Sequence, residues 1–433
     1  MVKMQKKISV GAAIGIAAAA VLVGAVMTFQ VSYVTLQDQF EEKYLTELKD
    51  PSAEKEPVRV IEKNYSEFIT NVADKLSEVD AIYRDNYLGE LDNEVLMDSI
   101  MEGYVYGTGD EYAAYYSDED FLALMSDLEG EMTGVGISVI YNTEYNVIEV
   151  LNVMPDSPAL EAGVKIGDLI ITVGEEKESV SALGYYPAVN KMQGEAGTEA
   201  VFTVARGENY EETVDFRITR AKVTELTVMY HVYEPDNTVG VIKITGFDSK
   251  TPEQFVEAVS ELGMQGCEKL VVDLRYNPGG ELNSILSILD FLVPEGPIIR
   301  IFDKDNNEVE AYYSEADELD VPIAVLVNGS TASAAELFTS TLRDYNKATI
   351  VGTTTYGKGC MQTTMALSDY SAVSVTFRMY NPPFSENYHG VGIVPDVVVE
   401  LDEAVADKNI YKITDAEDNQ LAAAVATFYE KAE

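Results

Sequence analysis

Two short stretches of the sequence carry side chains that could perform nucleophilic chemistry together. Residues 328–345 read NGSTASAAELFTSTLRDY and follow the apolar run IAVLVN, so Ser333 is predicted to lie where a strand meets a helix. The free N–H groups and the dipole of a helix N-terminus favour a developing negative charge. Residues 355–362 read TYGKGCMQ, with Lys358 between two glycines. A lysine in an apolar pocket loses its charge more easily and can then act as a general base. The alternatives are a helix cap of small residues and an exposed turn lysine.

Two glycine-containing stretches could present backbone N–H groups. Residues 273–280, DLRYNPGG, end a predicted strand in Gly279 and Gly280, whose N–H groups could face a reacting carbonyl. Residues 134–137, GVGI, precede another predicted strand. Glycines there can turn successive N–H groups inward to hold a carboxylate, and the strand beside them can pair with an extended peptide. The alternatives are an ordinary turn and a glycine-rich hairpin.

The composition excludes several function classes. The chain has 433 residues and a formal charge of −44, from 74 acidic and 30 basic residues, so its surface repels the phosphates of nucleic acids. Only two histidines, His231 and His389, and two cysteines, Cys267 and Cys360, are present. So few ligands disfavour a zinc site. A hydrolase of the Ser-His type would have to use one of the two histidines.

The N-terminus predicts a membrane anchor. Lys3, Lys6 and Lys7 precede Ile8–Phe29, a segment without any charged residue. About twenty residues at ~1.5 Å each span roughly 30 Å, the thickness of a hydrocarbon core. The flanking lysines predict that the N-terminus is cytoplasmic and that the rest of the chain is extracytoplasmic. A cleaved signal peptide, with secretion, is the alternative.

These segments must be positioned by a chain of several domains, since 433 residues exceed one ordinary domain. The pattern predicts a multidomain α+β protein with an α/β core containing parallel strands. The predicted parts are a cytoplasmic stub and transmembrane helix (1–30), a linker (31–57), a helical region (58–126), a β-rich domain (127–222), the α/β core (223–400) and a C-terminal helical tail (401–433).

Taken together, these motifs resemble the C-terminal processing peptidases, or tail-specific proteases, a group of serine peptidases of family S41 that carry a PDZ domain. GVGI followed by SPALEAGVKIGDLIITVG resembles the PDZ domain over 127–222. The resemblance to the peptidases extends from about residue 60 to 433. Its motifs appear in the family's order: GDEYAAYYSDEDF, the NPGG loop, NGSTASAAE, VGTTTYGKGCMQ and YHGVGIVPD.

The resemblance implies a role for each motif residue. The catalytic serine falls on Ser333, the general-base lysine on Lys358 and the lysine-orienting glutamine on Gln362. The oxyanion hole maps to the amides of Ala334 and of Gly279 or Gly280, between which the sequence does not decide. The PDZ carboxylate site maps to Gly134, Val135, Gly136 and Ile137. No metal or organic cofactor is implied.

Two positions depart from the family pattern. Family members often have an arginine in the PDZ domain that senses substrate, and Gln193 occupies its place, which puts gating through that residue in doubt. Cys360 stands where serine or threonine is common, and we expect a small packed residue there; the alternative is a reactive thiol close to a cationic lysine.

The function that we expect is an extracytoplasmic serine endopeptidase with a Ser-Lys dyad, acting on proteins or peptides with free, apolar C-termini. A homo-oligomer is left open. The alternative is a catalytically silent PDZ scaffold that only tethers partners.

Overall fold

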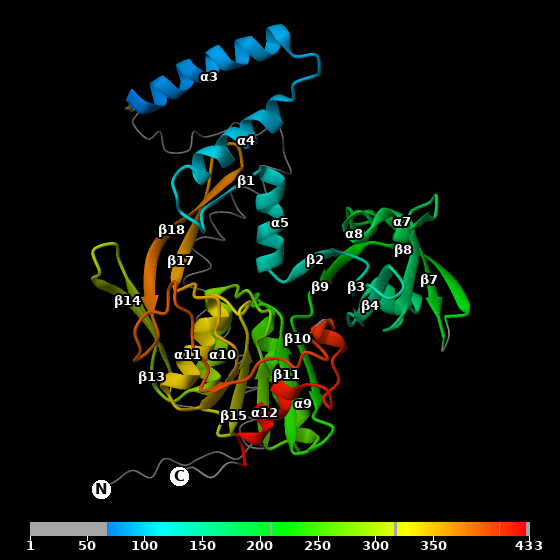
Figure 1. Ribbon diagram of the computed structural model, residues 1–433, viewed down its shortest axis with the longest axis vertical. Coiled ribbons are helices and arrows are strands. Elements are labelled where there is room, and N and C mark those ends of the chain that lie inside the picture. The colour runs from blue at the N-terminus through cyan, green and yellow to red at the C-terminus, as the bar shows by residue number, and fades with distance from the viewer. Residues whose placement is uncertain (1–66, 208–209, 316–317, 407, 430–433) are drawn as a thin grey trace. The chain divides into compact units, whose positions relative to one another are not determined.

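A computed structural model describes residues 67–207, 210–315, 318–406 and 408–429 (Figure 1). The anchor predicted at Ile8–Phe29 and the linker predicted at 31–57 lie outside the described residues. Among the residues that are described, no helix is both long and apolar enough to cross a membrane. The contacts divide the chain into two compact units.

The smaller unit contains the described residues before Leu124 together with Met361–Phe377. Its helices are α3 (Glu67–Asn86), α4 (Asn93–Tyr106) and the first part of α5 (Asp118–Leu128). Helix α4 begins after Asp92, whose carboxylate accepts hydrogen bonds from the amides of Glu94 and Val95. This is the usual way in which an aspartate caps the free N–H groups of a helix. These helices lie in the region for which the sequence predicts mostly helix.

A short strand, β1 (Ala114–Tyr116), interrupts the region predicted to be helical. It pairs antiparallel with the start of β18 (Ala372–Asn381), and β18 also pairs with β17 (Cys360–Ala366). The Asp110 carboxylate accepts hydrogen bonds from the amide (2.9 Å) and the hydroxyl (2.8 Å) of Thr376. The local sequence does not predict β1, because three residues form a strand only where a distant segment offers an edge.

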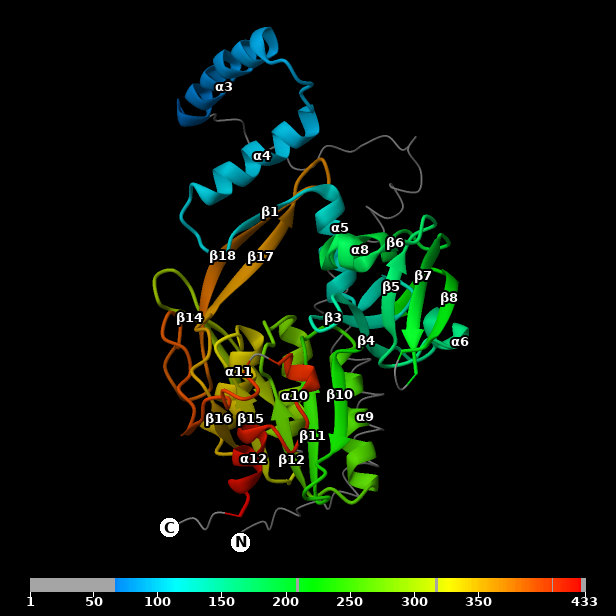
Figure 2. The same cartoon turned by 45° about the vertical axis from the view of Figure 1, so that its right-hand side comes forward.

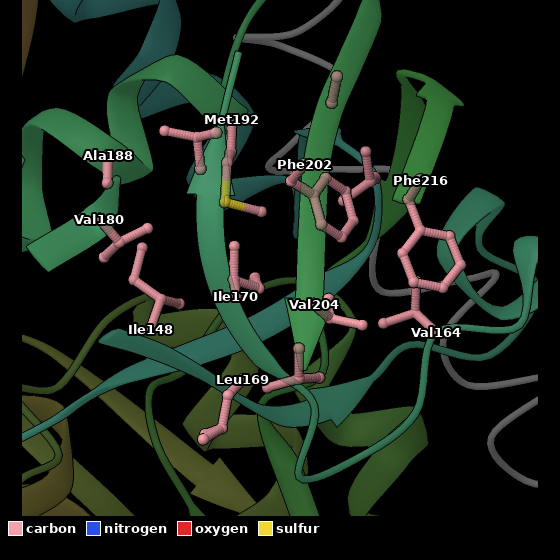
Figure 3. Packing of buried hydrophobic residues seen from close by; sticks show 14 of the residues in the cluster. Ile148, Val164, Leu169, Ile170, Val180, Ala188, Met192, Phe202, Val204 and Phe216 are labelled. Carbon is pink, nitrogen blue, oxygen red and sulfur yellow. The ribbon is translucent and has the colours of Figure 1, made fainter. Parts of the chain in front are cut away.

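The larger unit includes a β-rich domain with its own core. Its sheet has the order β3-β4-β5-β7-β8, with β6 paired to β5. The strands are β3 (Ile137–Asn142), β4 (Val147–Val153), β5 (Leu169–Val173), β6 (Glu178–Ser179), β7 (Glu199–Arg206) and β8 (Glu212–Thr219), and the helices are α6 (Pro158–Ala162), α7 (Val180–Leu183) and α8 (Tyr185–Met192). Figure 3 shows Ile170 and Phe202 of the sheet packed with Val180 and Met192 of the helices.

The chain enters and leaves this domain through one antiparallel pair, β2 (Glu131–Gly134) with β9 (Ala221–Thr224). The two ends of the β-rich segment therefore lie side by side, which agrees with a domain inserted between the helical region and the core.

The second part of the larger unit is a six-stranded sheet of order β10-β11-β12-β15-β16-β19 (Figure 2). Strands β11, β12, β15, β16 and β19 run parallel to one another, and β10 at the edge is antiparallel to β11. The strands are β10 (Val228–Val232), β11 (Val239–Ile244), β12 (Lys269–Asp273), β15 (Ile323–Val327), β16 (Ala348–Gly352) and β19 (Val397–Val398). A smaller group of paired strands contains β13 (Gly296–Phe302), β14 (Glu308–Ser314) and the end of β18.

Helices cover both faces of the six-stranded sheet. The contacts place α9 (Thr251–Met264), α10 (Leu282–Leu292) and α11 (Ala334–Asp344) together on one side, and α12 (Asn419–Ala426) on the other. Leu421, Ala424 and Val425 of α12 pack on alternate strand residues such as Val271 and Leu326. The apolar run IAVLV of β15 and the apolar centre LVV of β12 thus follow from burial on both faces.

A buried ion network fastens α12 to the end of β12. Arg275 donates to both carboxylate oxygens of Asp273 (2.9 and 2.8 Å) and of Asp418 (3.1 and 2.7 Å). Burial alone would raise the pKa of Asp273, but the charges of Arg275 and Lys243 outweigh it and hold this pKa well below its usual range. Asp273 therefore adds stability above about pH 4, and that stability is lost as the pH falls further.

Substitution of Asp418 by alanine should lower the free energy of unfolding by about 3–5 kcal/mol, because it leaves the Arg275 charge buried with half its partners. Urea denaturation of the full chain measures this. The matched control is Glu417→Ala, which breaks an exposed ion pair with Lys408 (2.6 Å) and should cost less than ~1 kcal/mol. An equal loss of unfolding free energy in the two variants would show that the buried Arg275–Asp418 pair contributes no more than an exposed one.

Candidate active site

Three loops meet at one edge of the parallel sheet. Strands β12, β15 and β16 are neighbours, and their carboxyl ends lead into the NPGG loop, the turn that contains Ser333 and the loop that contains Lys358. This edge is where parallel α/β sheets place their binding sites. The Thr331 hydroxyl donates to Leu274 O (2.8 Å), and the Tyr356 amide donates to Thr331 O (3.0 Å). The fold thus brings together motifs that are far apart in the sequence: Asp273 and Lys358, for example, are separated by 85 positions.

Ser333 has a strained backbone conformation. Its φ of 56° and ψ of −118° lie outside the regions that residues with a side chain ordinarily adopt. It immediately precedes helix α11, as predicted, and its carbonyl accepts the amides of Glu336 (2.9 Å) and Leu337 (3.0 Å). Strain of this kind persists only where the surroundings impose it, and it is concentrated at functional sites.

One buried carboxylate connects the serine turn to the lysine loop. The Glu336 side chain is fully buried, and its Oε2 accepts the amides of Ser333 (2.9 Å) and Lys358 (2.8 Å). Its Oε1 accepts the Thr355 hydroxyl (2.5 Å) and the Gly357 amide (2.7 Å). Both loops are therefore fixed to one side chain. The motifs predict no role for Glu336, although its position three residues after a serine is the spacing of a capping box.

The glycines of the NPGG loop lie against the serine turn. A side chain at Gly279, which has a φ of 106°, would place its Cβ 2.9 Å from Ala332 O and from Ala334 N. The Gly279 amide already donates to Asn277 Oδ1 (2.8 Å). Of the two glycines, Gly280 is therefore the better candidate for an oxyanion donor, together with Ala334 at the start of α11. The missing side chain of Gly279 instead allows the NPGG loop to approach the serine turn closely.

Gln362 lies on β17, in the smaller unit, where its amide donates to Thr376 Oγ1 (3.3 Å). Lys358 is half-buried in the larger unit. The orienting role of Gln362 toward Lys358 stays a prediction.

The GVGI segment forms a tight turn between β2 and β3. Val135 is buried and its carbonyl accepts the Ala159 amide (2.8 Å). Gly136, with a φ of 83°, lies so close to Ser157 that an added Cβ would be 2.2 Å from the serine Cβ. Among the described strands, β3 pairs only with β4, so the edge that begins at Ile137 is available to an added strand.

Helix α8 also contacts the strand that follows GVGI. The Tyr185 hydroxyl donates to Val139 O (3.2 Å) of β3. Gln193 is the exposed residue that ends α8, and the buried Arg220 donates to Met192 O (2.8 Å) at the same helix end. The Arg220 guanidinium therefore binds the carbonyls at the end of α8 and does not face solvent.

The cysteines and His389 are packed or hydrogen-bonded within the fold. Cys360 and Cys267 are free and buried, and Cys360 is packed at the start of β17, as expected. The His389 Nδ1 accepts the Gly359 amide (3.3 Å). Within the described ranges, no group of three or more His, Cys, Asp or Glu side chains is arranged to hold a metal ion.

Comparisons relate the chain to known proteins. Residues 238–399 match the family model described as Peptidase family S41. The chain is 32% identical over 323 residues to a carboxy-terminal-processing protease of Bartonella bacilliformis, covering 73% of this chain and 72% of that one. It is 30% identical over 354 residues to a probable CtpA-like serine protease of Staphylococcus aureus, covering 80% and 69%. A solved photosystem II D1 C-terminal processing protease is similar at 26% identity and a TM-score of 0.43, covering 77% and 88%.

Replacing Glu336 by glutamine should lower the free energy of unfolding by about 2–4 kcal/mol, because an amide group would face buried N–H donors that need an acceptor. Urea denaturation of the full chain measures the change. Glu318→Gln is the control, since its carboxylate meets Lys347 at 3.4 Å and is partly exposed, and it should cost less than ~1 kcal/mol. If the Glu336 variant were as stable as the control, the carboxylate would not be the link between the two loops.

Proposed function

Because the chain belongs to peptidase family S41 and is a serine-type peptidase, we propose that Ser333 is its nucleophile and Lys358 its general base. The observation that carries the proposal is the shared carboxylate: Glu336 Oε2 accepts the amides of both residues. Two loops that are held by one oxygen atom have little freedom to separate. A fixed distance between nucleophile and base is the requirement of a catalytic pair.

The proposed reaction is acyl transfer. The Lys358 amine takes the proton of the Ser333 hydroxyl as Oγ attacks the scissile carbonyl carbon, and the proton then passes to the leaving amine. The amides of Gly280 and Ala334 stabilise the oxyanion. Water attacks the resulting ester, and the serine is regenerated as the substrate's carboxyl product leaves.

The β-rich domain is proposed to capture the C-terminus of the substrate, as a PDZ domain does. Three observations support this role: the turn at Gly136, the buried Val135 and an edge of β3 with which no described strand pairs. An extended peptide can add to that edge, with its carboxylate at the N–H groups of the turn and its last side chain near Ile137.

The site is proposed to act outside the cytoplasm, anchored by the segment Ile8–Phe29. The support is the sequence alone: a charge-free segment after three lysines. Secretion after cleavage of this segment remains the alternative, and a homo-oligomer remains open.

A silent scaffold is the competing function. It would bind C-termini through the β-rich domain and cleave nothing. The intact arrangement of Ser333, Lys358 and Glu336 favours the peptidase. A scaffold that only binds C-termini would not need a serine with a strained backbone held beside the lysine loop.

Substitution of Ser333 or Lys358 by alanine should abolish cleavage, since the two act as a unit and losing either costs nearly as much as losing both. Cleavage of a fluorogenic peptide with a free apolar C-terminus, by the full chain in detergent, measures the effect. Ser330→Ala, three residues away on an exposed turn, is the matched control and should be mild. Inactivation by Ser330→Ala instead would show that the nucleophile is misassigned.

Amidation of the substrate's C-terminus should weaken binding by about 1–3 kcal/mol, the range for losing charge-assisted hydrogen bonds. The comparison uses one peptide with a free and an amidated end, and measures KM and kcat/KM. Equal cleavage of the two peptides would mean that the β-rich domain does not select termini.

A further inference from the structure

Two buried tyrosines meet beside the candidate site. Tyr380, near the end of β18, is 3% exposed, and Tyr388, in the loop that follows, is 6% exposed. Their rings are nearly perpendicular, at 79°, and their hydroxyl oxygens are 2.7 Å apart. Tyr388 is the first residue of the YHGVGIVPD motif, for which no chemical role is expected, and Tyr380 lies outside the motifs.

The hydroxyl pair lies against the carbonyls of Ser333 and Lys358. The Tyr380 hydroxyl is 3.0 Å from Lys358 O and 3.4 Å from Ser333 O, and the Tyr388 hydroxyl is 3.4 Å from Ser333 O. The pair has two protons to place. If Tyr380 donated to Tyr388, the 3.0 Å contact with Lys358 O would carry no proton and only the 3.4 Å contact of Tyr388 with Ser333 O would remain, so the shorter contacts favour donation by Tyr388 to Tyr380.

The donor order follows from these distances. Tyr388 donates to Tyr380, and Tyr380 donates to Lys358 O with Ser333 O as a second, longer acceptor, an arrangement known as a three-centre bond. Burial raises the pKa of both tyrosines well above its usual value, so both hydroxyls keep their protons. The donation by Tyr388 prevents the Tyr380 hydroxyl from rotating away from the carbonyls.

The tyrosines complement Glu336. Glu336 binds the amides of Ser333 and Lys358, and the Tyr380 hydroxyl contacts the carbonyls of the same two residues. The backbone of each residue is thus held at both ends. For Ser333 this matters most, because its strained φ and ψ would relax if one end were released.

We infer that the Tyr380–Tyr388 hydroxyl pair is a positioning device that fixes the nucleophile turn relative to the lysine loop. The inference rests on the proposed function, in which Ser333 and Lys358 react together. The tyrosine hydroxyls contact the backbone carbonyls of these two residues, and they act through that backbone.

The test compares Tyr388→Phe, Tyr380→Phe and the double variant in the full chain. A fluorophosphonate, which labels reactive serines, counts the competent sites, so that kcat is expressed per site. We expect kcat to fall about 3- to 10-fold for Tyr388→Phe and roughly 10- to 100-fold for Tyr380→Phe, with KM unchanged, as one or two hydrogen bonds are lost. The double variant should match Tyr380→Phe within about 2-fold, because Tyr388 acts through Tyr380.

Tyr345→Phe is the matched control. Its hydroxyl also donates to a backbone carbonyl of the same unit, Pro297 O at 2.9 Å, and its loss should leave kcat per site unchanged. If the two test variants lose stability but match the control in kcat, the pair is only structural and the inference is wrong. Should Tyr380→Phe fail to fold, Tyr388→Phe decides alone.

The failure of the two proposals can be told apart. A wild-type protein that cleaves through Ser333 and Lys358, with tyrosine variants like the control, overturns the positioning role alone. A Ser333→Ala protein that still cleaves overturns the proposed function and the positioning role with it.

Discussion

The backbone of Ser333 is the constraint around which the neighbouring structure is organised. A residue in such a conformation costs on the order of 1–3 kcal/mol, so other interactions must outweigh it. Glu336 and the first turn of α11 supply hydrogen bonds to its amide and carbonyl. Gly279 packs against it from the NPGG loop, where a larger residue would collide. The strained serine therefore depends on the ends of three adjacent strands at once.

Much of the fold could be predicted from the sequence, because the signals are local. The apolar runs IAVLV and KLVVD are buried strands, AELFTSTLRD is a helix, and the segment between GVGI and Arg220 is a β-rich domain. Motifs at strand ends could be expected to meet, since parallel strands bring their carboxyl ends to one edge.

The contacts that hold the site could not be predicted in the same way. Tyr380 and Tyr388 meet Ser333 from 47 and 55 residues further along the chain, and no local pattern marks a tyrosine as a donor to a particular carbonyl. The use of the Gly279 amide by Asn277 also depends on how the loop turns. Strand β1 likewise exists only through its pairing with β18. Such features arise from tertiary packing, which the single sequence encodes without displaying.

The order in which the chain is synthesised gives the Arg275–Asp418 pair a further consequence. Arg275 lies two residues before Asn277, the first residue of the NPGG loop, and it meets Asp418 only after 143 further residues have been made. At ~5–20 residues per second, translation needs roughly 7–30 s to supply that partner. Until then the Arg275 guanidinium can bind only one of its two carboxylate partners, Asp273. Helix α12 does not yet cover its face of the sheet. Before residue 418 has been made, the sheet that carries the loops of Ser333 and Lys358 therefore lacks both the α12 cover of one face and the second carboxylate partner of Arg275.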